Sequence, residues 1–261
     1  KKINVLPGPP ALYQSILSSP NFTSFNISSL ELAITGAASI PVQLIKDMEE
    51  IMGFKTILTA YGLTETTGVV TMCSPGDDPE LIANTSGRAI EGVEVKCVDR
   101  SGREVPKGEP GEVYVRGYNV MLGYLEDEKQ TKEAINPEGW LKTGDIGVMN
   151  PSGYLKITDR IKDMFIVGGF NTYPAEIENI LAKHKNIIST AVIGVPDDRL
   201  GEVGKAFVVL KEKAKILEED LINWCKEHMA NYKVPREVVF VNQLPLNASG
   251  KVMKYKLRKD G

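Results

Sequence analysis

Four polar loops hold the side chains of this sequence that could take part in chemistry. Tyr61–Thr66 offers an aromatic ring, two hydroxyls and a carboxylate after an apolar run. Asp145 ends a Thr-Gly-Asp sequence and could accept hydrogen bonds from a diol such as a ribose, while Asp159-Arg160 adds a permanent cation. Leu246–Lys251 is a glycine-bearing turn that projects one lysine. Each loop alone also fits an ordinary turn.

Several common kinds of catalytic centre have no matching pattern. No two glycines are separated by a single residue, so the Gly-x-Gly-x-x-Gly dinucleotide pattern is missing. Gly204-Lys205 and Gly250-Lys251 lack the rest of a Walker loop. The two histidines, His184 and His228, fall near the ends of predicted helices. We therefore expect neither a metal site nor a histidine-dependent hydrolase from these patterns.

The composition is that of a soluble globular protein. The 261 residues are 42% hydrophobic and 25% charged, with a net charge of −3. This charge gives no general attraction to nucleic acid, and no apolar run approaches the roughly 20 residues of a membrane-spanning helix. The three cysteines are widely spaced, which argues against a disulfide framework. The expected location is the cytoplasm, and the oligomeric state stays open.

The first 80 residues show the elements that must position the Tyr61 loop. Strands are predicted at 3–6, 30–35 and 56–60, and helices at 10–17 and 41–52. This alternation predicts a parallel α/β layer, whose ligands bind beyond the carboxyl ends of the strands. Gly36 and Gly62 both fall at such ends. Their placement is the first indication of function.

From about Gly87 the pattern changes to paired strands. Hairpin-like pairs are predicted at 93–98 with 111–116 and at 146–149 with 154–158, with a loop at 139–145 between them. We expect a small antiparallel β-barrel here. After Arg160 the order is strand, helix, two strands, helix and strand, which predicts a small α+β domain.

These elements predict a division into two domains. Residues 1–160 would form the end of a large domain, with an α/β layer over 1–80 and the barrel over 81–160. Residues 161–261 would form a mobile C-terminal domain, closed by a lysine-rich helix over 252–259 whose charges are solvated.

The segment 158–178 joins the two expected domains. It combines a charged turn that is costly to bury, a short strand, the pair Gly168-Gly169, and a helix that Pro174 opens at its first position. On these residues alone an ordinary strand–turn–helix link is favoured.

Read together and in this order, the loops resemble the AMP-forming acyl-CoA synthetase superfamily. That superfamily includes fatty-acyl and coumarate CoA ligases, beetle luciferases and peptide-synthetase adenylation domains. The resemblance covers essentially the whole chain, and six or more short patterns in register are very specific. The matching stretches are Gly36–Ala38, Tyr61–Thr66, Gly117, Trp140–Asp145, Asp159–Lys162, Gly168–Asn171, Pro174–Glu178 and Asn247–Lys251.

The resemblance implies ATP or AMP, Mg²⁺, coenzyme A and a carboxylic acid as ligands. For the nucleotide and acyl group it implies these contacts: Gly36, Ala37, Ala38 and Gly62 at the adenine and acyl pockets, Tyr61 against adenine, Thr64 on the α-phosphate, Glu65 on Mg²⁺, and Asp145 with Arg160 on the ribose. Asp159 and Arg160 together would close this nucleotide site. Small residues at Gly62 and Gly68 mildly favour a medium or long fatty acid as substrate.

The same resemblance implies two half-reactions with different needs. A carboxylate that attacks an anionic α-phosphate needs positive charge, which Lys251 would supply. A thiolate that attacks the neutral acyl-adenylate needs room instead, which Gly168, Gly169 and Phe170 would give along a thiol tunnel. A rotation at the hinge residue Lys162 would exchange the two arrangements.

The sequence departs from this superfamily in one respect. The Ser/Thr/Gly-rich phosphate loop that precedes these patterns in the superfamily is absent, so the chain resembles a C-terminal half and would be inactive without its N-terminal half. A luciferase-like oxygenase, a carrier-protein-loading adenylation domain and a non-catalytic nucleotide- or acyl-binding module remain as alternatives.

Overall fold

The computed structural model describes residues 2–36, 40–212, 214–247 and 252–258. The chain divides into two compact units, Lys1–Ile157 and Thr158–Gly261. The division falls just before residue 160, where the sequence predicts a domain boundary.

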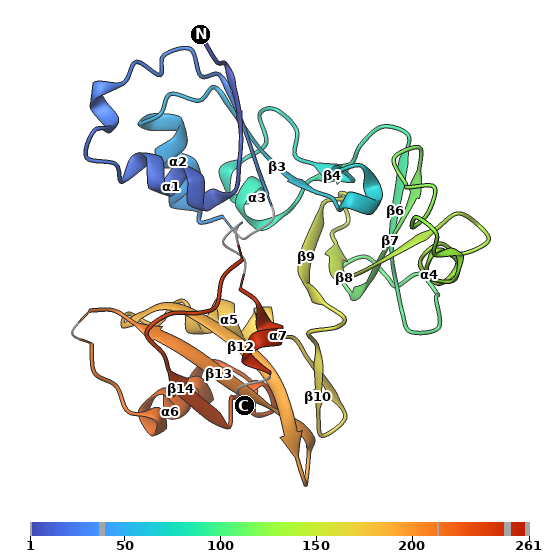
Figure 1. Ribbon diagram of the computed structural model, residues 1–261, viewed down its shortest axis with the longest axis vertical. Helices are drawn as coiled ribbons and strands as arrows, with labels where there is room; N and C mark the ends of the chain where they lie inside the picture. Colours follow the sequence, from blue (N-terminus) through green and yellow to red (C-terminus); the bar gives the residue numbers. More distant parts are fainter. Residues whose placement is uncertain (1, 37–39, 213, 248–251, 259–261) are drawn as a thin grey trace. The chain divides into compact units, whose positions relative to one another are not determined.

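Unit 1 begins with a five-stranded sheet in the order β1-β2-β3-β4-β5. The first three strands are parallel, which confirms the predicted α/β layer, and β4 and β5 add antiparallel neighbours. Helices α1, α2 and α3 belong to this layer (Figure 1). The strands are β1 (Val5–Pro7), β2 (Leu32–Gly36), β3 (Thr56–Tyr61), β4 (Thr71–Met72) and β5 (Arg88–Ala89). The helical segments are α1 (Pro10–Leu17), η1 (Phe22–Ser24), α2 (Val42–Glu50), η2 (Thr64–Thr66) and α3 (Pro79–Asn84).

Helix α2 shows how this layer is held together. Its apolar side chains Leu44, Ile45 and Met48 are buried in one cluster with Tyr13 of α1. Ile51, which the 3.6-residue period places on the same face, is 56% exposed. Ile51 is the C-cap residue of α2, which ends at Glu50.

The second part of unit 1 is an antiparallel sheet in the order β6-β7-β8-β9. Its strands are β6 (Val93–Val98), β7 (Pro110–Gly117), β8 (Leu141–Met149) and β9 (Leu155–Arg160), and the helix α4 (Glu128–Ala134) lies between β7 and β8 in the chain. The antiparallel sheet was predicted, but the closed barrel was wrong. Among the described residues, β6 and β9 are the two edge strands of this sheet, so the sheet is open. Four strands are too few to close a barrel.

The predicted loop at 139–145 is also corrected. Strand β8 begins at Leu141, which pairs with Val115 of β7, so most of this stretch is β-structure.

Unit 2 is a sheet in the order β11-β10-β13-β12, with β14 parallel to β13. The predicted alternation of strands and helices is present, with β11 as an added strand. The strands are β10 (Phe165–Val167), β11 (Phe170–Thr172), β12 (Ile187–Asp197), β13 (Gly201–Leu210) and β14 (Glu237–Phe240). The helical segments are α5 (Pro174–Leu181), α6 (Glu218–His228), η3 (Asn231–Lys233) and α7 (Lys254–Leu257).

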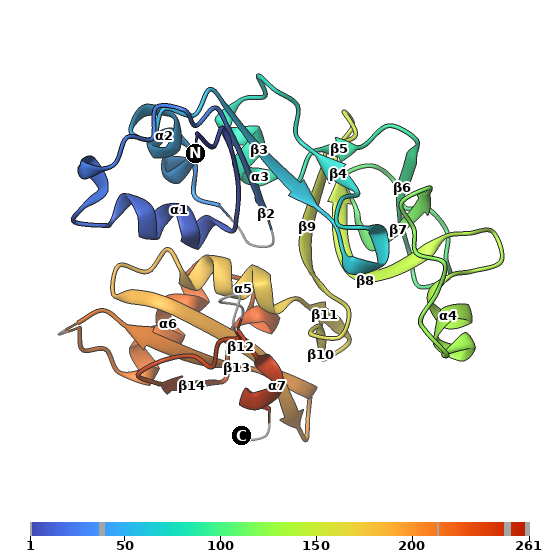
Figure 2. The same cartoon turned by 45° about the horizontal axis from the view of Figure 1, so that its top comes forward.

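Two clusters of buried side chains hold unit 2 together. Ile177 of α5 and Leu221 of α6 share one cluster with Val192 and Val208 of the sheet. Leu257 of α7 joins a second cluster with Ile193 and Phe207. Since side chains alternate along a strand, the two clusters lie on opposite faces of the sheet, and Figure 2 shows α5 and α7 on its two sides.

The sequence predicts that the charges of the last helix are solvated, and this is wrong for Lys254. Lys254 Nζ lies 2.8 Å from Glu178 Oε1 of α5, and the two side chains are only 15% and 21% exposed. Lys254 therefore anchors α7 instead of facing water, whereas Lys256 of the same helix is exposed. None of the helices within the described ranges is both long and apolar enough to span a bilayer.

Candidate active site

Tyr61 and Asp145, both predicted to contact the nucleotide, meet directly in unit 1. Tyr61 Oη donates a hydrogen bond of 2.6 Å to Asp145 Oδ2 across a separation of 84 residues. Tyr61 is the last residue of β3, and Asp145 belongs to β8. Asp145 is 2% exposed. The structure thus brings the carboxyl end of the parallel layer and the antiparallel sheet together at these two side chains.

A β-bulge sets the direction of Asp145. Glu112 of β7 pairs with Ile146 and Tyr114 pairs with Lys142, so Thr143, Gly144 and Asp145 stand opposite the single residue Val113. Gly144 has a φ of +70°, which glycine adopts at low cost. Thr143 Oγ1 donates to Val113 O at 2.8 Å and accepts from Asp145 N at 3.1 Å. Bulges redirect side chains in this way, and here the redirected one is Asp145.

Glu112 lies beside this bulge. Its Oε1 accepts a hydrogen bond of 3.3 Å from Gly144 N. Burial raises the pKa of the Glu112 carboxyl, and the charge of Asp145 raises it further, against lowering by the Gly144 amide and Lys142. Sequence reasoning missed Glu112, because a glutamate in a strand carries no signal of its own.

The Tyr61–Thr66 loop continues into η2, where its threonines differ in role. Thr66 is buried and its Oγ1 accepts from Leu63 N at 2.9 Å, so it closes the turn. Thr64 is exposed and Glu65 is half-buried, which leaves both able to face a ligand.

Gly62 is explained by a close backbone approach. A Cβ on Gly62 would lie 2.2 Å from Gly68 O. This close packing is enough to explain why residue 62 is a glycine, and no ligand is needed for the explanation. The place of Gly62 at the acyl pocket stays a prediction.

A second loop braces η2. Met121 N donates to Glu65 O at 2.8 Å, and Tyr124 Oη donates to Glu65 Oε1 at 3.0 Å. Thr67 Oγ1 donates to Asn119 O at 2.9 Å, and Asn119 Nδ2 donates to Val69 O at 2.7 Å. We call residues 117–124 the brace loop. The sequence singled out only its first residue, Gly117, so Asn119 and Tyr124 were missed.

Glu65 could bind a magnesium ion only together with ligands from outside the protein. The described part of the chain contains no group of three or more His, Cys, Asp or Glu that could hold a metal. Mg²⁺ usually takes one or two carboxylates together with substrate phosphates and waters. A single half-buried Glu65 suits that arrangement.

Several predicted site residues belong to unit 2, and Asp159 has a structural role there. Asp159 Oδ2 accepts from Ala175 N in the first turn of α5 at 2.8 Å, and Oδ1 accepts from Arg160 N at 2.7 Å. Asp159 is 8% exposed, and burial raises its pKa despite the two amide donors. In this structure its carboxylate binds α5, and its predicted part in closing the nucleotide site stays a prediction. Arg160 is the last residue of β9.

The turn that contains Lys162 is held by Arg258, the residue that follows α7. Arg258 Nη2 donates to Lys162 O at 3.4 Å and to Asp163 Oδ1 at 2.9 Å. The hinge residue of the prediction therefore has its carbonyl bound within unit 2.

The pair Gly168-Gly169 forms the turn of the β10–β11 hairpin. Val167 pairs with Phe170, and the two glycines have φ values of +55° and +90°. A two-residue hairpin of this kind needs positive φ at both positions, so the turn alone explains the glycines. Phe170 is 59% exposed and stacks on Tyr232, with ring centroids 4.9 Å apart.

Three predicted site residues, Ala37, Ala38 and Lys251, lie outside the described residues. Gly36 is the last residue of β2 and directly precedes Ala37. Leu246 and Val252 form an antiparallel bridge on either side of the stretch that contains Lys251.

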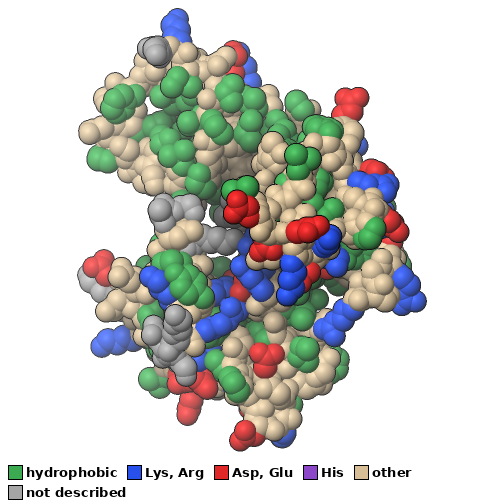
Figure 3. Space-filling model, turned by 45° about the vertical axis from the view of Figure 1, so that its right-hand side comes forward, with side chains coloured by type: hydrophobic (Ala, Val, Ile, Leu, Met, Phe, Trp, Pro, Cys, Tyr) green, Lys and Arg blue, Asp and Glu red, His purple; other side chains and the backbone are tan. Residues whose placement is uncertain are grey.

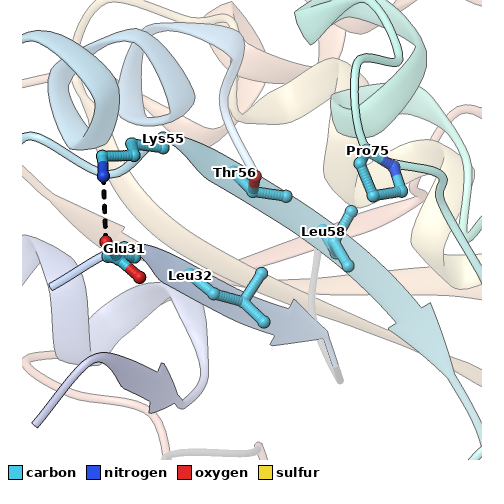
Figure 4. A pocket seen from close by; sticks show the side chains of 6 residues that line it. All are labelled: Glu31, Leu32, Lys55, Thr56, Leu58 and Pro75. Atoms are coloured by element: carbon cyan, nitrogen blue, oxygen red, sulfur yellow. Dashed lines mark hydrogen bonds and ion pairs between the residues drawn. The ribbon is translucent and has the colours of Figure 1, made fainter.

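A surface hollow of about 360 Å³ in unit 1 is not the candidate site. Figure 4 shows it beside Leu32 and Thr56, the first residues of β2 and β3, with the Lys55–Glu31 ion pair of 2.9 Å at its edge. It therefore lies at the amino ends of the parallel strands. Tyr61 and Gly36 lie at the carboxyl ends, where such sheets bind ligands.

Comparison with known proteins agrees with the resemblance drawn from the loops. Residues 1–125 match the family model of the AMP-binding enzymes, and residues 176–251 match that of the AMP-binding enzyme C-terminal domain. A methyl-dioxo-octahydro-indenyl propanoyl:CoA ligase of Rhodococcus jostii is 52% identical over 260 residues, which cover 100% of this chain and 48% of the relative. The mitochondrial medium-chain acyl-CoA ligase ACSF2 of Danio rerio is 39% identical, covering 99% of this chain and 43% of that protein.

Solved structures agree on the fold. The crystal structure of ATP-bound MatB from Rhodopseudomonas palustris matches with a TM-score of 0.89 and 34% identity, over 99% of this chain and 51% of MatB. The chain thus spans about half the length of the relatives it matches. Two family models in the expected order, together with sequence relatives named as CoA ligases, confirm the resemblance: the chain belongs to the family of AMP-binding enzymes.

Proposed function

We propose that this chain is the C-terminal half of an AMP-forming acyl-CoA ligase. The observation that carries the proposal is the Tyr61–Asp145 pair at the carboxyl end of β3. It places an aromatic ring and a carboxylate together, which suits an adenine and the ribose attached to it. Because Asp145 is 2% exposed, a ribose would have to replace contacts that Asp145 makes in this structure.

The first half-reaction would join the carboxylic acid to AMP. A carboxylate oxygen attacks the α-phosphorus of ATP, the bond to the β-phosphate breaks, and pyrophosphate leaves. Thr64 donates to the α-phosphate, Arg160 assists Asp145 at the ribose, and Lys251 supplies positive charge as the negative charge builds up. Glu65 would hold Mg²⁺, which would supply further positive charge beside the phosphates.

The second half-reaction would form the thioester. The sulfur of coenzyme A attacks the carbonyl carbon of the acyl-adenylate, the bond to the phosphate oxygen breaks, and AMP leaves. Gly168, Gly169 and Phe170 line the approach of the thiol, after a rotation at Lys162 has withdrawn Lys251.

The relatives suggest two classes of acid. The sequence mildly favoured a medium or long fatty acid, and the 39% identical relative is named a medium-chain ligase. The 52% identical relative is named for an alicyclic propanoyl group, and the higher identity makes a ring-bearing propanoate our first candidate. Since Gly62 is explained by packing, it no longer supports a deep pocket for a long chain.

The proposal includes a missing N-terminal half as partner, without which the chain is inactive. Among the described residues, β1 forms the edge of its sheet, and Ile3, Phe25 and Ile51 are 59%, 67% and 56% exposed. In the view of Figure 3 hydrophobic side chains gather on the surface of this layer. An edge strand and an apolar surface are what a further part of the same domain would cover. Three buried free cysteines support a cytoplasmic location.

The test uses the full-length protein with ATP, Mg²⁺ and a panel of acids that contains an indane propanoate and octanoate. We expect pyrophosphate release that depends on the acid, and acyl-CoA and AMP once coenzyme A is added. Acylation of a carrier protein but not of coenzyme A would support the carrier-loading alternative. Nucleotide binding without pyrophosphate release would support a non-catalytic module, and acyl-AMP formation by residues 1–261 alone would contradict the need for a second half.

A further inference from the structure

Four hydrogen bonds join the brace loop to the segment from Glu65 to Val69. Three hydrogen bonds that involve main-chain atoms already join the loops: Met121 to Glu65, Thr67 to Asn119, and Asn119 to Val69. The bond from Tyr124 Oη to Glu65 Oε1 is different, because it joins two side chains and acts on a carboxylate. It changes little in the path of the loop, but it restricts where the charge of Glu65 can lie.

Tyr124 is well suited to hold another side chain in place. Its backbone N donates to Thr131 Oγ1 of α4 at 2.8 Å, and it forms a bridge with Asp127 just before that helix. Its neighbours Leu122 and Leu125 are 102% and 93% exposed, whereas Tyr124 is 37% exposed. Tyr124 is thus much less exposed than Leu122 and Leu125, between which it lies in the chain.

The hydrogen bond leaves Glu65 with one oxygen for a ligand. Oε1 accepts from Tyr124, while no other described residue reaches Oε2 with a hydrogen bond or an ion pair. A glutamate side chain loses rotamer freedom when it binds a cation, and a partner that has already restricted it lowers that cost.

We propose that Tyr124 is a positioning residue for Glu65, whose hydroxyl directs Oε2 toward the cation that accompanies ATP. This inference rests on the proposed function, since that function brings ATP and Mg²⁺ to Glu65. It adds a residue that no sequence pattern indicated and explains why the brace loop lies against η2.

The test is calorimetric binding of α,β-methylene-ATP to the full-length protein at a series of Mg²⁺ concentrations. Tyr124→Phe keeps the ring and removes the hydroxyl, and Tyr118→Phe is the matched control on the same loop, since Tyr118 is 76% exposed. We expect Tyr124→Phe to raise the Mg²⁺ concentration for half-maximal binding about fivefold, as for a partly exposed hydrogen bond to a charge. Binding without Mg²⁺ and Tm should stay unchanged.

A double variant separates positioning from general loop support. In a Glu65→Gln background, Tyr124→Phe should have no further effect on the Mg²⁺ dependence, because the two side chains act as one unit. A loss of binding that is equal with and without Mg²⁺, or no difference from Tyr118→Phe, would overturn the inference while the proposed function stands. A wild-type protein that binds no nucleotide would overturn both.

Discussion

Tyr61 Oη donates a 2.6 Å hydrogen bond to Asp145 Oδ2 and so joins the end of β3 to the bulge of β8. The two residues are 84 positions apart, and the bond makes one polar site out of two loops. A carboxylate that is 2% exposed depends on such a donor, because a buried charge without partners is costly.

The bond can be tested with Tyr61→Phe in the full-length protein. We expect KM for ATP to rise roughly tenfold with a smaller change in kcat, since a hydrogen bond to a charged group contributes about 1.5 kcal/mol or more. Steady-state kinetics with saturating acid and coenzyme A measure the effect. An unchanged KM for ATP, relative to the exposed control Tyr118→Phe, would remove Tyr61 and Asp145 as a functional pair.

A second prediction concerns stability at Gly62. A Cβ there would meet backbone atoms of Gly68 and Val69 within 2.7 Å, so Gly62→Ala should lower the free energy of unfolding by about 3 kcal/mol. Gly76→Ala is the control, because Gly76 also lies in a loop but has open space and a φ of +85°. That variant should cost only about 1 kcal/mol. Urea unfolding measures both free energies. If Gly62→Ala and Gly76→Ala lose the same free energy of unfolding, the close backbone approach is not the reason for a glycine at position 62.

The third prediction concerns Asp159 and Ala175, which lie on either side of Lys162 in the chain. Asp159 caps α5 through Ala175 N, so Asp159→Ala should destabilise unit 2 by about 1 kcal/mol, while Asp159→Asn keeps an acceptor and should lose less.

The hydrogen bond from Ala175 N to Asp159 Oδ2 can also be used to test the predicted hinge at Lys162. A rotation at Lys162 would move Ala175 away from Asp159, so the Ala175 amide should exchange with solvent at different rates in complexes with an acyl-adenylate analogue and with coenzyme A. Lys162→Pro should abolish the thioester step and spare adenylation. Identical exchange in the two complexes, or equal loss of both steps, would place the pivot elsewhere.

The fourth prediction is a pH dependence at Glu112. Burial raises the pKa of this carboxyl in the folded state above its ordinary 4.5, so the folded protein binds more protons than the unfolded chain between 4.5 and the raised value. Stability from this group therefore falls as pH rises through that window. Glu112→Gln keeps an acceptor for Gly144 N and removes the charge.

The variant should thus have a higher Tm than wild type at neutral pH, by roughly 2 °C, with the difference vanishing below pH 4.5. Thermal unfolding over a pH series measures it. A difference that grows as pH falls would show that the sign is wrong.

The sequence predicts much of this fold because its elements depend on local patterns. Helix α1 begins and ends where the apolar period and Pro10 predict, and the parallel order of β1, β2 and β3 follows from their alternation with helices. The closed barrel was wrong because hairpin patterns indicate pairing of neighbours but not whether the first and last strands meet.

The site was predicted less completely, because its details depend on contacts between distant segments. Tyr61 and Asp145 were singled out separately, but their bond requires the bulge at Thr143–Asp145, which the sequence presents as a loop. Tyr124 lies in an exposed loop without a pattern of its own. Lys254 looked solvated because the sequence does not place Glu178 beside it.

The central claim is that the full-length protein forms an acyl-adenylate and then transfers the acyl group to a thiol. A single-turnover experiment with an indane propanoate, ATP and Mg²⁺ tests it most directly, with coenzyme A added only after the first phase. We predict one equivalent of pyrophosphate and enzyme-bound acyl-AMP before the addition, then acyl-CoA and AMP after it, with Lys251→Ala slowing only the first phase. Formation of ADP and phosphate in place of AMP and pyrophosphate would contradict the account.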